Sequence, residues 1–197
     1  MTDNRQTVGL IAGFAAGGRL DNLIAIRLRW PLLIFGALAL RLGTEAALTR
    51  DVGIVDSLRV PLLAAAYGIL GVGLWANRAR PGMSLALVGM GLNATAILVN
   101  GGFMPVWEPS LTAAGFGRAD VLSPIHVILP ATLDANFLRS AGPLGDLIPV
   151  PLPWLRNVLS IGDVILGAGL AFFLFAGLVR RPAETWPDGR PIHGLDP

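Results

Sequence analysis

The chain has 197 residues, of which 53% are hydrophobic and only 14% are charged. A soluble domain usually carries about a quarter charged residues, so this composition places the chain among membrane proteins. The net charge of only +2 excludes the strongly basic surface that binds nucleic acids. The absence of cysteine excludes a disulfide framework, a thiolate nucleophile and a cysteine-ligated metal.

The first apolar segment, residues 8–17, is shorter than the roughly twenty residues that cross the hydrocarbon core of a bilayer. It is compatible with a short tilted helix, an interfacial helix or the core of a signal peptide. Within it, Gly13 and Gly17 form a GxxxG pair, which permits close packing against another helix. We expect a short N-terminal hydrophobic helix, because cleavage here would contradict the arginine pattern described below.

Longer apolar runs follow and predict transmembrane helices, since each is close to the length that spans a bilayer. We therefore expect an all-α integral membrane protein, a bundle of four spans with a long irregular outer loop at residues 100–160. The membrane domain would be single and end near residue 180, and residues 181–197 would form a disordered cytoplasmic tail. The predicted spans are about residues 30–48, 60–76, 82–99 and 161–179.

Arginines cluster in every second gap between these runs, and positive charge stays on the cytoplasmic side of a membrane. The outer loop is therefore predicted to be extracytoplasmic and the C-terminus cytoplasmic, in the inner membrane of a bacterial cell. All fifteen basic residues are arginine, as expected for a GC-rich bacterial genome. The clustered arginines are Arg19, Arg27 and Arg29, then Arg78 and Arg80, and finally Arg180 and Arg181.

Polar side chains inside the predicted spans form one candidate site. Arg41 and Glu45 stand one helical turn apart in the first span, so they share a face and can pair. Tyr67 and Asn93, in the next two spans, fall at a similar depth near the midplane, slightly toward the outer side. Charged groups at membrane depth are costly and are candidates for function. A buried binding or proton-handling site is one interpretation, and structural pairing of these groups is the favoured one.

Two helix ends carry capping signals. Asn100, Gly101 and Gly102 follow the third span and predict a helix C-cap with a sharp turn, because glycine adopts positive φ angles readily. Asn100 is also a candidate binding residue at the start of the outer loop. Ser160 and Asp163 have the spacing of a capping box at the start of the last span, which explains both without catalysis.

The outer loop holds His126, the only histidine outside the tail. It lies in the apolar segment 121–129, which predicts a strand or a segment on the bilayer surface. Asp134 and Asp146 are its candidate partners in a catalytic site on the outer surface, since histidine and carboxylates exchange protons. A hydrogen-bonding role for His126 is the favoured alternative. The spacing matches no metal-ligand motif, so we expect no metal and no cofactor.

The order of four short elements resembles the domain of unknown function 5317 family, small multi-pass bacterial membrane proteins, over about residues 8–180. Two departures are a shorter first apolar segment and a longer stretch between Asp134 and Pro143. The resemblance implies a membrane location and no established activity. The elements are Gly17-Gly18-Arg19-Leu20; Asn100-Gly101-Gly102-Phe103-Met104-Pro105-Val106; His126 with Thr132-Leu133 and Leu144-Gly145-Asp146; and Ser160-Ile161-Gly162-Asp163.

Three hypotheses of function remain. The favoured one is a non-enzymatic accessory or structural membrane protein, because the chain shows no catalytic signature. The second is a small transporter or ligand-binding membrane protein that uses the layer of Arg41, Glu45 and Asn93. The third is a membrane enzyme with a histidine–aspartate site on its outer surface. In each case the expected partners are the lipid bilayer and either another membrane protein or further copies of this chain.

Overall fold

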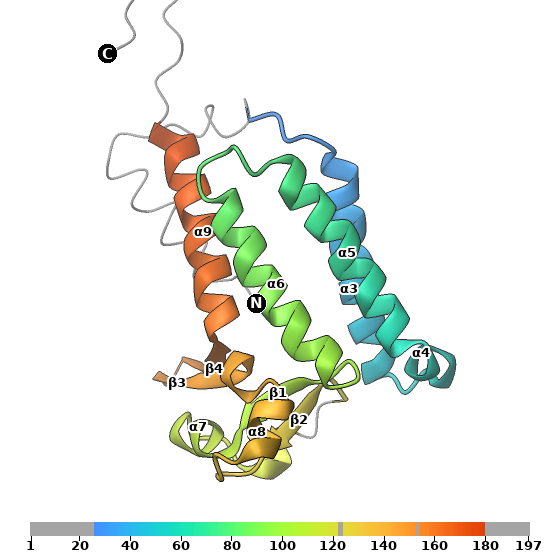
Figure 1. Ribbon diagram of the computed structural model, residues 1–197, viewed down its shortest axis with the longest axis vertical. Coiled ribbons are helices and arrows are strands. Elements are labelled where there is room, and N and C mark those ends of the chain that lie inside the picture. The colour runs from blue at the N-terminus through green and yellow to red at the C-terminus, as the bar shows by residue number, and fades with distance from the viewer. Residues whose placement is uncertain (1–25, 122–123, 153, 180–197) are drawn as a thin grey trace, which may run out of the picture.

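The computed structural model describes residues 26–121, 124–152 and 154–179, arranged as a layer of long helices with a small sheet at one end (Figure 1). Two predicted segments, residues 8–17 and 181–197, lie outside the described residues. The same holds for Arg19, Arg180 and Arg181. We call the two described parts the helix layer and the sheet subdomain.

The apolar runs predicted as spans form the long helices of the helix layer, with closely matching bounds. Three of them, α3, α5 and α9, are long and apolar enough to cross a membrane. The remaining helix, α6, is apolar and slightly shorter, at 17 residues. The bounds are Pro31–Thr49 for α3, Arg59–Ala76 for α5, Met83–Val99 for α6 and Ile161–Val179 for α9.

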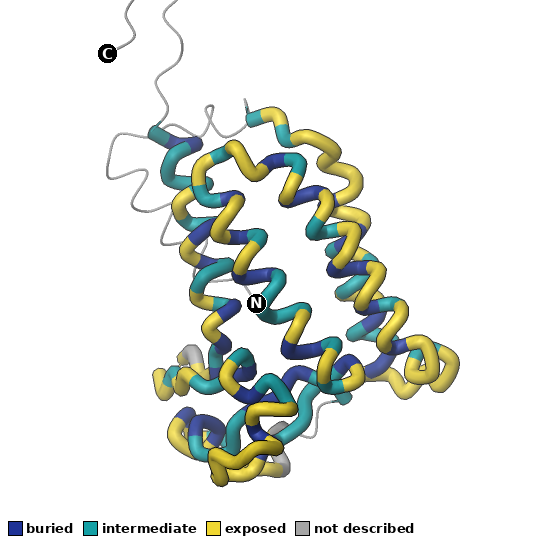
Figure 2. The backbone as a smooth tube through the Cα atoms, in the orientation of Figure 1, coloured by how far each residue is buried: buried dark blue, intermediate teal, exposed yellow. Residues whose placement is uncertain are grey.

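The long helices pack as a row, with α3 against α5, α5 against α6, and α6 against α9. Between the described parts of α3 and α9 there is no comparable contact, so the expected four-helix bundle is not confirmed. Buried and exposed positions alternate along each helix (Figure 2). The exposed positions include large apolar side chains such as Leu32, Phe35 and Phe172. Lipid chains can cover such apolar faces. In lipid there is no hydrophobic driving force between apolar helices, so these faces need not be buried against another helix.

Glycines allow α6 and α9 to approach until their backbones touch. A Cβ atom built on Gly89 would lie 2.3 Å from the backbone nitrogen of Leu166 and 2.5 Å from the carbonyl oxygen of Gly162. A Cβ atom on Gly169 would lie 2.5 Å from the backbone nitrogen of Ala86. Small residues at a helix interface are the usual source of van der Waals packing between membrane helices.

Residues 104–160 fold into a four-stranded sheet, so the expectation of an all-α chain with an irregular outer loop is wrong for this segment. The strand order is β2-β1-β3-β4. Strand β1 pairs in parallel with β2 and β3, and β3 pairs antiparallel with β4. The bounds are Met104–Trp107 for β1, His126–Leu129 for β2, Asp146–Leu152 for β3 and Leu155–Ser160 for β4.

Prolines in β3 are tolerated because most of this strand has only one neighbour. It pairs with β1 at a single position, Val106 with Asp146, and from Ile148 onward it pairs with β4 alone. Pro149 and Pro151 therefore lie where one strand edge is open, which is where proline occurs in sheets. Short helices complete the fold: α4 at Gly53–Ser57, α7 at Glu108–Ala113, η1 at Arg118–Val121, α8 at Ala135–Arg139 and η2 at Gly142–Leu144.

Both predicted caps are confirmed. The Asp163 backbone N–H donates to Ser160 Oγ at 2.8 Å, and the Ser160 backbone N–H donates to Asp163 Oδ2 at 3.2 Å, which is a complete capping box. At the end of α6, Gly101 and Gly102 have φ angles of 65° and 91°. The Gly102 N–H donates to the Ile97 carbonyl at 2.9 Å, which closes the last turn of the helix.

Arg59 joins the helix layer to the sheet subdomain. Its buried guanidinium forms an ion pair with Asp56, at 2.6 Å from Nη2 to Oδ1, and donates to the Pro124 carbonyl. Its Cζ atom lies 4.0 Å from the centre of the Phe103 ring, a cation–π distance. The first turn of α5 is thereby fixed to the segments before β1 and β2, and this contact sets how the sheet sits on the helices.

At the opposite end, Asn77 ties the segment before α3 to the end of α5. Its buried side-chain amide accepts from the Arg29 N–H and donates to the Arg29 and Gly73 carbonyls, each at 2.8 Å. Its Oδ1 also accepts from the Arg80 Nε–H at 3.3 Å. Replacing Asn77 with leucine removes all four bonds, so we expect the free energy of unfolding in detergent to fall by about 2 kcal/mol. The exposed Asn136 offers a matched control, and Asn136→Leu is expected to change that free energy by less than about 0.5 kcal/mol. Equal effects of the two changes would contradict this assignment.

Candidate functional site

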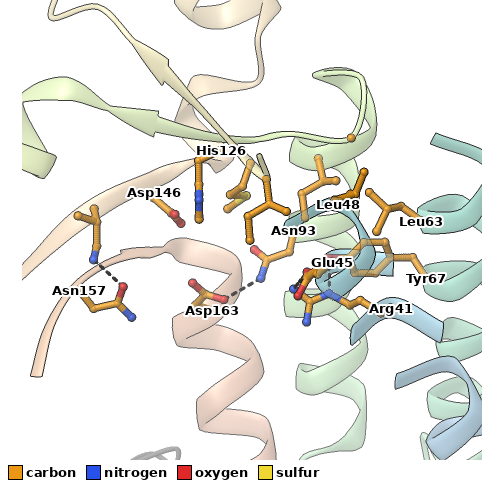
Figure 3. Close-up of a pocket in the computed structure, with 15 residues that line it drawn as sticks. Arg41, Glu45, Leu48, Leu63, Tyr67, Asn93, His126, Asp146, Asn157 and Asp163 are labelled. Atoms are coloured by element: carbon orange, nitrogen blue, oxygen red, sulfur yellow. Dashed lines mark hydrogen bonds and ion pairs between the residues drawn. The ribbon is translucent and has the colours of Figure 1, made fainter. Parts of the chain in front are cut away.

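A cavity of about 220 Å³ lies where the helix layer meets the sheet subdomain, and we call it the junction cavity. Polar side chains from both parts converge on it (Figure 3). It brings together most of the residues that the sequence analysis singled out, from segments far apart in the chain. The helices contribute Arg41, Glu45, Tyr67, Asn93 and Asp163, and the strands contribute His126, Asp146 and Asn157.

Among the described residues that line the junction cavity, Arg41 is the only arginine. Its Nη2 atom lies 2.7 Å from Glu45 Oε1, so the predicted pairing along the helix is present. Its Nε–H also donates to the Tyr67 hydroxyl oxygen at 3.0 Å. The side chains of Arg41 and Glu45 keep 33% and 22% of their surface exposed. The ion pair is therefore still reachable by a small molecule.

Asn93 connects two helices at the edge of the cavity. Its Nδ2 donates to Asp163 Oδ1 at 2.8 Å, and its Oδ1 accepts from Ser160 Oγ at 2.8 Å. Both ends of the amide are thus used by the first turn of α9. These two hydrogen bonds fit a structural role for Asn93, in which it joins α6 to α9. Its position in the cavity lining also fits a role in ligand binding.

His126 and Asp146 occupy the sheet side of the cavity, with their polar ends facing the same space (Figure 3). Asp146 is buried at the first position of β3. The Nδ1 atom of His126 is buried and has no hydrogen-bond partner among the described residues. Burial also lowers the pKa of His126 below its ordinary value of 6.5, so the imidazole is neutral at pH 7.

This lowered pKa makes stability depend on pH. The folded pKa of His126 lies below the unfolded value of 6.5, so the unfolded chain takes up the proton more readily as pH falls. Wild-type protein should therefore lose stability below about pH 6.5, and His126→Asn and His126→Gln should lose less over the same range. Chemical unfolding in detergent from about pH 7 to about pH 5 measures the difference. Parallel curves for the wild type and both variants would contradict the role of burial.

Two candidate residues lie outside the cavity lining and have local structural partners. Asn100 Nδ2 donates to the Ala96 and Ser140 carbonyls, at 2.7 and 2.8 Å. Asp134 Oδ1 accepts from the backbone N–H groups of Asn136 and Phe137, at 2.9 and 3.0 Å, and caps α8. The structure therefore brings His126 and Asp146 together without Asp134. A catalytic or binding role for any of these residues stays a prediction.

Sequence reasoning did not single out Asn157, which lines the cavity from β4. The one signal for it is the polar pair Arg156-Asn157 between the apolar residues Leu155 and Val158. The sequence predicts that Asp163 caps the first turn of α9, and the structure confirms this. Asp163 also lines the junction cavity. In the described ranges no group of three histidine, aspartate or glutamate side chains is arranged to hold a metal ion.

These features define a class: a small, mostly helical protein with helices apolar and long enough for a membrane, a four-stranded sheet at one end, and a polar cavity between them. Residues 25–175 match the family described as Family of unknown function (DUF5317), and the chain belongs to that family. The resemblance stated from the sequence elements is thus confirmed.

A curated relative, described as an uncharacterized protein of Thermotoga maritima, is 36% identical over 126 residues. The match covers 60% of this chain and 62% of the relative, which is less than two thirds of the relative's length. No solved structure matches the chain.

Proposed function

We propose that α3, α5, α6 and α9 all cross the inner membrane of a bacterium, with the sheet subdomain on the extracytoplasmic side. Arginines gather at the other end of the helix layer, where Arg27 and Arg29 precede α3 and Arg78 and Arg80 connect α5 to α6. Arg80 donates to the Arg27 carbonyl, so these two segments are neighbours. Positive charge marks the cytoplasmic side, which supports this orientation.

Within that arrangement the chain acts as a membrane protein that binds a small polar ligand in the junction cavity. The observation that carries this proposal is the convergence of Arg41, Glu45, His126 and Asp146, from distant segments, on one space. Charged groups inside a membrane are costly and are candidates for function by default. Pairing accounts for Arg41 with Glu45, but it does not require a cavity beside them.

The size of the junction cavity limits the ligand to a small molecule. Drug-sized ligands occupy pockets of roughly 300–1,000 Å³, and this cavity measures about 220 Å³. Its lining offers a guanidinium, carboxylates, a phenol and an imidazole, so it suits a solute that forms several hydrogen bonds. Binding of such a solute accounts for the cavity better than a purely accessory role does. The accessory role stays a prediction.

Cysteine substitution tests this proposal, because the natural chain has no cysteine that would react in the background. Glu45 lines the junction cavity, while Leu42, on the same helix, is 57% exposed on an apolar surface that lipid would cover. In lipid vesicles, a small water-soluble methanethiosulfonate should modify Glu45→Cys much faster than Leu42→Cys, since the reactive thiolate is disfavoured in apolar surroundings. Equally slow modification of both variants would contradict a water-accessible site.

A further inference from the structure

A second cavity, of about 440 Å³, lies at the end of the helix layer away from the sheet, and we call it the arginine-end cavity. It forms where the segment before α3, the connection from α5 to α6 and the last turns of α9 meet (Figure 1). None of its described lining residues lines the junction cavity, so the two spaces are separate. The lining includes Ile26, Arg80, Phe173 and Ala176.

Arg80 carries a positive charge at this cavity that no described carboxylate balances. Its Nε–H donates to Asn77 Oδ1 at 3.3 Å, and its Nη2 donates to the Arg27 carbonyl. Both acceptors are uncharged, and within the described part of the chain no aspartate or glutamate forms an ion pair with Arg80. The guanidinium therefore keeps its full charge and is able to donate to an anion.

The arginine end of the helix layer is positive as a whole. Arg27, Arg29 and Arg78 lie in the same two connecting segments as the cavity lining. Every described carboxylate lies instead in the sheet subdomain or in the part of the helix layer nearest to it (Figure 1). Charges of one sign around a cleft raise the local concentration of the opposite ion, so this end attracts anions.

Two tryptophans indicate that this end lies at the surface of the bilayer. Trp30 stands just before α3 and Trp75 near the end of α5, and both side chains are exposed. The Cζ atom of Arg78 lies 4.3 Å from the centre of the Trp75 ring, a cation–π distance. Tryptophan is enriched at the level of lipid headgroups, because its ring is apolar and its N–H is polar. In the proposed orientation the mouth of the cavity therefore lies among the headgroups.

The cavity continues from this charged mouth into apolar surroundings. Phe173 lies six residues before Val179, the last residue of α9, which corresponds to about 9 Å along the helix axis. Ala176 lines the space between these levels with a methyl group, and Ile26 adds an apolar side chain from the segment before α3. A phospholipid has the matching arrangement, with a charged phosphodiester at the bilayer surface and acyl chains below it.

We propose, given the membrane arrangement proposed above, that the arginine-end cavity binds an anionic phospholipid of the cytoplasmic leaflet. The phosphodiester accepts hydrogen bonds from the Arg80 guanidinium, and the first part of one acyl chain lies against Phe173 and Ala176. Basic pockets between membrane helices on the cytoplasmic side bind such headgroups. At about 440 Å³ the cavity is within the size range of pockets for drug-sized ligands, so it has room for these parts of the lipid.

Native mass spectrometry of the full chain, in detergent with equal amounts of dioleoyl phosphatidylglycerol and dioleoyl phosphatidylcholine, tests this inference. The two lipids have the same acyl chains and differ in net charge, so the ratio of the bound forms reports selection of the headgroup. We expect roughly tenfold more bound phosphatidylglycerol than phosphatidylcholine, because each arginine near the headgroups adds to the attraction. Equal binding of the two lipids, or binding of neither, overturns the inference.

Two arginine variants separate the cavity from the charge on the surface around it. Arg80→Gln removes the cation that lines the cavity and should lower the preference for phosphatidylglycerol roughly fivefold. Arg78→Gln is the matched control, since Arg78 is exposed in the same connection but outside the described lining. Its loss should change the preference by less than about twofold, because salt screens exposed charges. Equal effects of the two changes overturn the proposed site.

A third variant keeps the test independent of the hydrogen bonds that Arg80 makes within the protein. Ala176→Leu leaves every arginine in place but fills part of the cavity, so the amount of bound phosphatidylglycerol should fall severalfold. Ala171→Leu makes the same change on α9 outside the described lining and should leave binding unchanged. Wild-type binding in Ala176→Leu overturns the inference.

A competition experiment distinguishes the lipid from a soluble anion. Glycerol phosphate carries the same kind of phosphate without acyl chains, and an excess of it should leave phosphatidylglycerol bound. Displacement by glycerol phosphate overturns the lipid assignment in favour of a soluble phosphate. The proposed function fails separately, because Glu45→Cys lies near the other end of the helix layer and its modification does not depend on which lipid binds.

Discussion

Gly89→Leu is expected to separate α6 from α9 and to prevent the native fold. A Cβ atom at this position would meet the Leu166 nitrogen at 2.3 Å and the Gly162 oxygen at 2.5 Å. Both are backbone atoms of α9, so no side-chain rotation relieves the clash. Overpacking usually costs about 1–3 kcal/mol, and a clash with backbone lies at or above the upper end of that range.

Gly91→Leu is a well-matched control, because it makes the same change on the same helix. A Cβ atom at Gly91 would meet nothing within 4 Å. Unfolding in mixed micelles with increasing denaturing detergent should show Gly89→Leu unfolded or less stable by about 3 kcal/mol, with Gly91→Leu close to wild type. If the two variants were equally stable, the close packing of α6 on α9 would be wrong.

Ser160→Ala is expected to have the second largest effect on stability. Ser160 is fully buried, and its Oγ accepts from the Asp163 N–H and donates to Asn93 Oδ1, both at 2.8 Å. Alanine at an N-cap costs about 1 kcal/mol. The orphaned Asn93 oxygen adds about 1–3 kcal/mol. We therefore expect the free energy of unfolding to fall by about 2–4 kcal/mol.

A double-mutant cycle separates the cap from the link between helices. Ser160→Ala, Asn93→Ala and the double variant should give a coupling of about 1 kcal/mol, because contacting residues are not additive. Strict additivity would show that Asn93 and Ser160 do not interact. Ser57→Ala, at an exposed serine, serves as the control for the loss of a hydroxyl.

The helices were predictable because a bilayer imposes a simple rule on sequence. Each span needs about twenty apolar residues, so runs such as 161–179 reveal α9 without any tertiary information. Local rules of the same kind identified the Ser160–Asp163 capping box and the Arg41–Glu45 pair. Each of these features depends on neighbours within one turn of helix, which the sequence shows directly.

The sheet was not predictable by the same means, because its pairing is not local. Met104 lies beside His126 across a parallel pair of strands with only four residues each. Strands this short carry almost no periodic pattern. In β3, Pro149 and Pro151 also argue against a strand, because proline within a sheet is confined to edges and bulges. Whether α6 and α9 belonged to a closed bundle was likewise undetermined, since hydropathy defines spans and not their neighbours.

The site was predicted in part. Arguments from depth placed Arg41, Tyr67 and Asn93 at one level, and these residues line the same cavity. The sequence predicts His126 and Asp146 as partners, but in a separate site on the outer surface. That they share a cavity with Arg41 could not be predicted, because they reach it only through the pairing of β1 with β2 and β3.

In the proposed orientation, the junction cavity and the sheet subdomain lie on the extracytoplasmic side of the membrane. Leu133, in the subdomain, and Ala79, between α5 and α6, are both exposed and suit single-cysteine labelling. With a membrane-impermeant maleimide on intact cells, Leu133→Cys should be labelled at once and Ala79→Cys only after the membrane is opened. Labelling of Ala79→Cys alone in intact cells would reverse the orientation, and immediate labelling of both would show that the helix layer does not span the membrane.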